Sequence, residues 1–171
     1  CKRNMPQNTE PHLTSPDTPS AWRERHLQRL LASYHRWTGH ALLPLDQAQP
    51  LAPQLWLAKR VIVSHGTEAD PVLNYGNLAA LQRWQMPWQK LVCTPSRLTA
   101  EPLAREERAA LLQRVAAHGY IDDYSGVRIA ANGQRFRIRQ AVVWNIVDEN
   151  GVYCGQAASF DQWDDLPAND A

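Results

Sequence analysis

The side chains of this sequence with the greatest capacity for acid–base chemistry occur as three carboxylate pairs. Glu68 stands two residues before Asp70, and the other two pairs are Glu106–Glu107 and Asp122–Asp123. Neighbouring carboxylates can move each other's pKa apart and so supply a reaction with an acid and a base. Here they fall in a predicted turn, on a charged helix face and at a strand start, and no nucleophile motif accompanies them. The pattern predicts a protein that is not an enzyme.

Histidine and cysteine are the usual ligands of transition metals, but their spacing does not favour a metal site. His65 lies in a predicted turn and has no second histidine two or four residues away. The three cysteines, Cys1, Cys93 and Cys154, contain no CxxC pair, so the sequence encodes neither a zinc cluster nor a disulfide framework. We expect reduced thiols and no bound metal.

Composition places the chain among single globular domains. It has 171 residues, of which 44% are hydrophobic, and its 18 Lys and Arg against 17 Asp and Glu give a net charge of +1. A net charge this close to zero does not indicate the basic surface that nucleic-acid binding needs. The apolar runs are shorter than the roughly 20 residues of a membrane span. We expect a cytoplasmic domain that binds neither nucleic acid nor membrane.

The N-terminal part divides into a tail and a helix. Residues 1–19 contain four prolines among small polar residues, a composition that predicts disorder. Ser20 suits a helix N-cap, and the helix 20–38 ends before Gly39. Its apolar stripe, with helical spacing, comprises Leu27, Leu30, Leu31 and Tyr34.

A β-hairpin followed by a helix is predicted next. The β-branched run 61–63 is typical of a strand, residues 66–71 supply turn chemistry, and residues 72–75 form a short second strand ending at Tyr75. Gly76 then allows a sharp change of direction. Asn77 is expected to cap the helix that follows, with its side-chain oxygen accepting from amides of the first turn.

The second half predicts a long helix and a three-stranded meander. The helix begins near Thr99 or Pro102 and ends at Gly119, with the charged "REER" (residues 105–108) as a solvated face and Leu111, Leu112 and Val115 as its apolar stripe. The dipeptides Asn132-Gly133 and Asn150-Gly151 then mark two hairpin turns between strands.

Together these elements predict an α+β fold, with a five-stranded antiparallel sheet and helices between the second and third strands. The domain is expected over residues 20–163, followed by a tail, 164–171. Strict alternation along the long strand 135–147 places Phe136 and Trp144 on one face and Arg139, Ala141, Val143 and Asn145 on the other. Both faces carry apolar groups, so the N-terminal helix or a second subunit should cover the face with Trp144.

Several stretches, in order, resemble the MEKHLA domain, a PAS-like family. They are RVIVSHGTEADPVLNYGN, PSRLTAEP, ERAALL, GYIDDYSGVRI and GQAASF, and Tyr75-Gly76-Asn77 also matches the Tyr-x-Asn with which the second PAS strand typically ends. The resemblance covers about residues 20–163. It implies a PAS-like fold and a role as a sensor or interaction module.

The resemblance also raises the question of a cofactor, which stays open. Flavin-binding PAS relatives carry a cysteine followed by Arg-Phe-Leu-Gln, whereas Thr-Pro-Ser-Arg follows Cys93 here. Haem-binding relatives use a histidine on the long helix, but His118 stands at its end, where a cation suits the helix dipole. Neither flavin nor haem is therefore expected.

A small-molecule site between sheet and helices is what the resemblance implies. Arg139, alternating with Ala141 and Val143, would anchor a carboxylate or phosphate on an apolar wall. Tyr124 and Asn145 are further candidates for ligand binding. The alternative is that Arg139 is an exposed strand residue paired with an acidic neighbour.

Two hypotheses of function follow. The first is a ligand-responsive sensor with a cavity in its core. The second is a dimerisation or protein-interaction module with a filled core and no ligand. Its interface, shared with a homodimer mate or another protein, would comprise Leu27, Leu31, Tyr34, Phe136 and Trp144.

Overall fold

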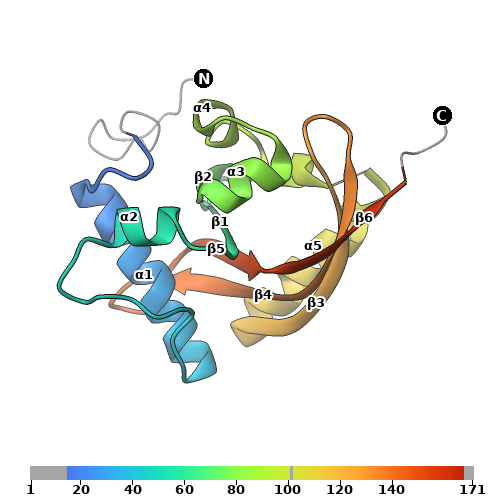
Figure 1. Ribbon diagram of the computed structural model, residues 1–171. Helices are drawn as coiled ribbons and strands as arrows, with labels where there is room; N and C mark the ends of the chain where they lie inside the picture. Colours follow the sequence, from blue (N-terminus) through green and yellow to red (C-terminus); the bar gives the residue numbers. More distant parts are fainter. Residues whose placement is uncertain (1–14, 101, 168–171) are drawn as a thin grey trace.

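A single antiparallel sheet forms the centre of the molecule (Figure 1). The computed structural model describes residues 15–100 and 102–167. The strand order is β2-β1-β5-β4-β3, and β6 also pairs with β4. The strands are β1 (Val61–His65), β2 (Leu73–Gly76), β3 (Tyr120–Ile129), β4 (Arg135–Val147), β5 (Tyr153–Phe160) and β6 (Gln162–Leu166). The predicted α+β class and antiparallel sheet are confirmed.

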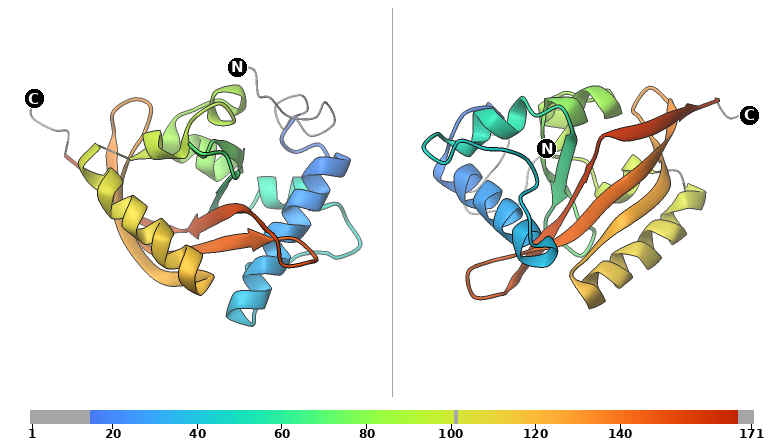
Figure 2. Two further views of the ribbon diagram at one scale, coloured as in Figure 1. Left: turned by 180° about the vertical axis from the view of Figure 1, so that it is seen from behind. Right: turned by 60° about the horizontal axis from the view of Figure 1, so that its bottom comes forward.

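Helices cover both faces of this sheet (Figure 2). They are α1 (Ala21–Thr38), α2 (Leu51–Trp56), α3 (Leu78–Trp84), α4 (Trp88–Leu91), the short 3-10 helix η3 (Ser96–Thr99) and α5 (Pro102–His118). Trp144 donates from Nε1 to the Leu30 carbonyl of α1 at 3.0 Å, whereas the adjacent Val143 packs with Leu111 and Val115 of α5. Since successive strand residues face opposite sides, α1 and α5 cover opposite faces.

Capping and an apolar stripe explain why α1 forms where it does. The side chain of Ser20 accepts from the amide of Arg23 at 3.1 Å, and the helix ends at Gly39, whose φ of 82° suits glycine. Leu27 and Leu30 are fully buried against the sheet. The described part of the chain contains no helix with the length and hydropathy of a membrane span.

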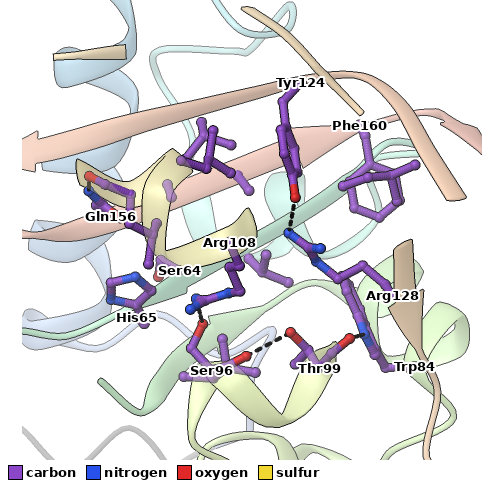
Figure 3. Close-up of a pocket in the computed structure, with 18 residues that line it drawn as sticks. Ser64, His65, Trp84, Ser96, Thr99, Arg108, Tyr124, Arg128, Gln156 and Phe160 are labelled. Atoms are coloured by element: carbon purple, nitrogen blue, oxygen red, sulfur yellow. Dashed lines mark hydrogen bonds between the residues drawn. The ribbon is translucent and has the colours of Figure 1, made fainter. Parts of the chain in front are cut away.

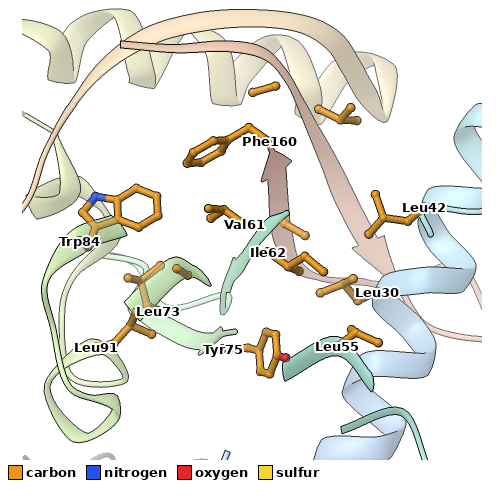
Figure 4. Close-up of a cluster of buried hydrophobic side chains, with 14 of the residues drawn as sticks. Leu30, Leu42, Leu55, Val61, Ile62, Leu73, Tyr75, Trp84, Leu91 and Phe160 are labelled. Atoms are coloured by element: carbon orange, nitrogen blue, oxygen red, sulfur yellow. The ribbon is translucent and has the colours of Figure 1, made fainter. Parts of the chain in front are cut away.

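The core continues on both sides of β1 (Figure 4). Ile62 points toward Leu30 and Leu55, while Val61 points toward the side that holds Trp84 and Phe160. The rings of Trp84 and Phe160 meet edge to face, with centroids 5.8 Å apart. The sheet is thus packed on both sides by side chains of this same chain.

The five predicted interface residues lie differently from the prediction. Leu27, Phe136 and Trp144 have no exposed surface, and Tyr34 is 5% exposed, while Leu31 is partly buried and packs against the core. The three residues of α1 pack with Trp144 on one face of the sheet, and Phe136 packs on Trp84 of α3. These side chains therefore contact one another and other core residues of the same chain. The interface assignment is therefore corrected to the core.

A backbone irregularity at Gln140 changes which residues of β4 share a face. Gln140 has a φ of 51°, and the pairing with β3 shifts by one residue there, as in a β-bulge. Before it Ile138 faces α3 and α5, and after it Val143 does so. The predicted grouping of Phe136 with Trp144 is therefore wrong, since the extra residue reverses the alternation.

The C-terminal boundary also differs from the prediction. Residues 162–166 form β6, which continues β5 along β4 after a break at Asp161, with Arg139 opposite Gln162. The predicted tail 164–171 therefore begins inside a strand, and the sheet has six strands rather than five. Of the other predicted tail, residues 1–14 lie outside the described part, as do residues 168–171.

The corner between β2 and α3 depends on Asn77. Its Oδ1 accepts from the amides of Ala80 and Ile62, both at 3.1 Å, and its Nδ2 donates to the carbonyls of Arg60 at 2.8 Å and Leu55 at 3.1 Å. Asn77 thus caps α3 and ties it to β1 and α2. Gly76 before it leaves room for Leu91, and Tyr75 packs edge to face on Trp88.

Candidate functional site

A cavity lies between the sheet and the helices η3 and α5 (Figure 3). Its volume is about 60 Å³, and one water needs only about 10 to 15 Å³ of such space. Much of the wall is apolar, with Val63, Leu111, Val143 and Phe160 among its residues. The polar part of the wall comprises Ser64, His65, Ser96, Thr99, Arg108, Tyr124, Arg128 and Gln156.

Arg128 of β3 is one of two guanidinium groups in this wall. It is 7% exposed and donates to the hydroxyl of Tyr124 at 3.0 Å and to the Val127 carbonyl at 2.9 Å. The Tyr124 ring reaches it across Gly126, where a Cβ atom would stand 2.2 Å from the tyrosine hydroxyl. Glycine at position 126 therefore permits the Tyr124–Arg128 contact.

Arg108 of α5 is the second guanidinium group. It is partly buried and donates to the hydroxyl of Ser96 in η3. Burial and, after it, the charge of Arg128 lower the pKa of Arg108 to about 10. Among the described residues, no carboxylate forms an ion pair with Arg108 or Arg128. Within the described part of the chain, two neighbouring cations thus face one cavity and form no ion pair with a carboxylate.

His65, at the end of β1, faces the cavity in its neutral form. Its Nδ1 lies 2.9 Å from the Gly66 carbonyl oxygen, and because a carbonyl can only accept, Nδ1 carries the proton. Burial lowers the pKa of His65, although the hydrogen bond to the Gly66 carbonyl and, for a charged ring, a hydrogen bond to the side chain of Gln156 favour its charged form. Nε2 is then an acceptor, and it is buried without a hydrogen-bond partner among the described residues.

Gln156 of β5 presents a second acceptor beside it. Asn145 donates from Nδ2 to the Val115 carbonyl at 3.1 Å, so its Oδ1 is free to accept from Nε2 of Gln156 at 2.9 Å. These contacts assign the amide orientation of Gln156. Its Oε1 is buried and has no partner in the described part of the chain.

Only one of the three predicted ligand-binding residues lines the cavity. Tyr124 does so. Asn145 instead orients Gln156 from behind, as described above. Arg139 lies half exposed on the other side of the sheet and pairs with Asp164 at 3.0 Å, because the bulge at Gln140 separates it from Val143. The predicted anchor role of Arg139 is corrected to that of a surface ion pair.

The lining residues that the sequence analysis missed include His65, Arg108, Arg128 and Gln156. Arg108 had been assigned to the solvated face of its helix. A signal did exist, since positions 108, 111, 112 and 115 have the spacing of one helical face. His65 had been placed in the turn, whereas it is the last, buried residue of β1.

The comparisons with solved structures identify the class of fold. The PAS domain of a protein from Colwellia psychrerythraea superposes with a TM-score of 0.57 at 14% identity, over 68% of this chain and 93% of that one. The light-state dimer of the fungal blue-light photoreceptor Vivid gives a TM-score of 0.56 at 13% identity, over 86% of this chain and 97% of that one. A Light-Oxygen-Voltage domain studied with a flavin analogue gives a TM-score of 0.54 at 13% identity, over 68% of this chain and 84% of that one. The chain therefore has a PAS fold.

The family follows from the sequence itself. The model of the MEKHLA domain matches residues 24–165, and the chain belongs to this family. The resemblance inferred from the short motifs is thus confirmed. No curated protein is significantly similar to the chain.

Flavin does not fit this cavity as it does in a photoreceptor that forms a cysteine adduct. Neither Cys93 nor Cys154 lines the cavity, and the guanidinium groups of Arg108 and Arg128 project into it from two sides. His118 is exposed at the end of α5. The described residues also hold no group of three or more metal-ligating side chains.

Proposed function

We propose that this domain is a ligand-responsive sensor module that binds a small molecule in the cavity between the sheet, η3 and α5. One observation carries the proposal, namely that Nε2 of His65 and Oε1 of Gln156 are both buried in the cavity wall without a partner among the described residues. An unpaired buried polar atom costs roughly 1 to 3 kcal/mol. A bound molecule that donates hydrogen bonds would remove this cost.

The arrangement around β1 gives binding a route to the opposite face of the sheet. Ser64, next to His65, contacts Nε2 of His26 in α1 at 2.8 Å and donates to Asn74 of β2 at 2.6 Å. A ligand that shifts His65 would therefore also shift the contact between β1 and α1. The cavity favours this proposal over an interaction module with a filled core.

The test compares small molecules released from the protein after native purification with those released from a variant whose cavity is filled. Ala158 faces the cavity, so Ala158→Leu should occupy it. Ala110→Leu makes the same change at an exposed position of α5 and is the control. Mass spectrometry of the released fraction, with native mass spectrometry of the intact protein, gives the readout.

We expect a compound that the wild type and Ala110→Leu release and that Ala158→Leu does not. The proposal is contradicted if the wild type carries no compound that Ala158→Leu lacks. A compound-free dimer would favour the interaction module instead.

A further inference from the structure

Two guanidinium groups at the cavity imply that its occupant is an anion. Arg108 and Arg128 come from α5 and β3 and meet the cavity from different sides (Figure 3). The described residues provide no carboxylate partner for either. The two positive charges repel each other, and an anion bound between them would remove this repulsion.

The burial of these groups in a partly apolar wall favours a carboxylate over a phosphate. Arg128 uses N–H groups for Tyr124 and Val127, and Arg108 uses one for Ser96. A carboxylate has two oxygens and can give one to each guanidinium. A phosphate carries close to two negative charges at neutral pH, and bringing it out of water into a wall that is in large part apolar costs more than for a singly charged carboxylate.

The side of the cavity that holds His65 and Gln156 requires a ligand group that donates hydrogen bonds. Figure 3 shows His65 and Gln156 on one side and Tyr124 with Arg128 on the other. Nε2 of neutral His65 and Oε1 of Gln156 are both acceptors without a partner among the described residues. An amino group can donate to both acceptors and a hydroxyl group to one of them, whereas a second carboxylate would be repelled by both.

The cavity volume limits the size of the molecule. With about 60 Å³ available and about 10 to 15 Å³ per water-sized position, there is room for roughly five such positions. This suits a molecule of two to five carbon atoms and excludes a nucleotide or a flavin.

From these observations we infer that the ligand is a small amino or hydroxy carboxylic acid, with its carboxylate between Arg108 and Arg128 and its amino or hydroxyl group toward His65 and Gln156. This inference rests on the proposed function, because it names the chemical class of the molecule bound in the same cavity.

The experiment uses isothermal titration of the whole chain with matched probes. The probes are the ω-hydroxy and ω-amino acids of two to five carbons, each with its amide and its unsubstituted acid. For four carbons the set includes 4-hydroxybutanoate, 4-hydroxybutanamide and butanoate. Inorganic phosphate is a further probe. Ala158→Leu is titrated in parallel.

We expect at least one hydroxy or amino acid to bind at least about 10-fold more tightly than its amide and about 5-fold more tightly than its unsubstituted acid. Arg108→Met should remove the preference for the acid over the amide. Arg128→Met should also remove this preference. If Arg128→Met does not fold because position 128 is buried, Arg108→Gln provides the second variant that tests the preference. Arg139→Met, at the surface ion pair, is the matched control and should retain the preference.

Three results would overturn the inference. Amides that bind as tightly as acids would exclude a carboxylate site, and phosphate that binds more tightly than every acid would reassign the anion. If unsubstituted acids bind as tightly as the corresponding hydroxy or amino acids, the ligand has no hydroxyl or amino group that donates to His65 and Gln156. In all three cases the cavity still binds a molecule and the proposed function stands. If no probe binds the wild type more tightly than Ala158→Leu, the inference about the chemical class of the ligand fails, and the comparison of released compounds described above decides the proposed function.

Discussion

The Nε2 atom of His26 lies 2.8 Å from the Oγ atom of Ser64, in a buried contact that joins α1 to β1. Ser64 gives its only hydroxyl proton to Oδ1 of Asn74, at 2.6 Å. The His26 ring must therefore donate from Nε2. Its ring stacks on Trp22, with centroids 4.9 Å apart. A second proton on this ring would find no acceptor among these neighbours.

Stability should consequently fall as the solution becomes acidic. Burial, followed by the charges of Arg29 and Arg23, lowers the pKa of His26 from 6.5 to about 4. Between these values the unfolded chain binds a proton that the folded chain does not, so the free energy of unfolding rises with pH across this window. The contribution is complete above pH 6.5 and is lost toward pH 4, with a total on the order of 3 kcal/mol.

Urea unfolding at pH 7.5, 5.5 and 4.5 measures this dependence. His26→Gln keeps a donor for Ser64 without a titrating ring and should flatten the dependence. His118→Gln changes an exposed histidine and should retain the wild-type slope. Some slope remains in His26→Gln because burial also lowers the pKa of His65. Equal slopes in all three proteins would contradict the assignment to His26.

Asn77→Ala should cost about 3 kcal/mol of stability, since it removes an N-cap and leaves buried backbone groups unpaired. Asn77 has no exposed surface, and its amide group bonds to Ile62, Ala80, Leu55 and Arg60. Chemical denaturation provides the measurement. Asn150→Ala, in the exposed turn after β4, should change stability by less than about 0.5 kcal/mol. A similar small loss for Asn77→Ala would show that this corner is not structurally important.

Gly155→Ala should be among the most damaging single changes in the sheet. A Cβ atom there would lie 2.1 Å from the backbone carbonyl oxygen of His65, and φ is 138°. We expect a loss of more than about 3 kcal/mol, since backbone of β1 must move. Gly133 also has a positive φ of 88° but open space around it. Gly133→Ala should therefore cost only about 1 kcal/mol of backbone strain. Equal melting temperatures for the two variants would contradict the predicted clash.

Phe136→Ala should lower stability by about 3 to 5 kcal/mol, the cost of a large cavity in a core, and leave the oligomeric state unchanged. Phe136 has no exposed surface, and its ring packs against Trp84 with centroids 5.6 Å apart. Tyr153, at 45% exposure, provides the comparison variant Tyr153→Ala. Size-exclusion chromatography combined with thermal unfolding separates the outcomes. A changed oligomeric state at unchanged stability would restore the predicted interface.

Local chemistry was sufficient to predict the order of elements. Ser20 and Asn77 were predicted as caps, and both side chains accept from the first turn of their helices. The hairpin turns at Asn132-Gly133 and Asn150-Gly151 separate β3, β4 and β5. Such signals are readable because cap and turn residues act on backbone groups only a few positions away.

The candidate site was much less accessible to sequence analysis. Arg139 was predicted as the ligand anchor from strict alternation along β4. The extra residue at Gln140 reverses the alternation, so Val143 faces the opposite side of the sheet from Arg139. Arg108 was assigned to solvent with its charged neighbours, although it points toward β3 and the cavity. His65 and Gln156 meet only because β1 pairs with β5, across 90 residues of chain that no local pattern connects.

The sequence alone therefore determined the class of fold, the family and the positions of most turns and caps, because these depend on neighbouring residues and on short motifs. Tertiary structure decided which polar groups share a cavity and which remain unpaired. That outcome depends on strand register, on one bulge and on the docking of α5, and these are settled by packing between distant segments of the chain.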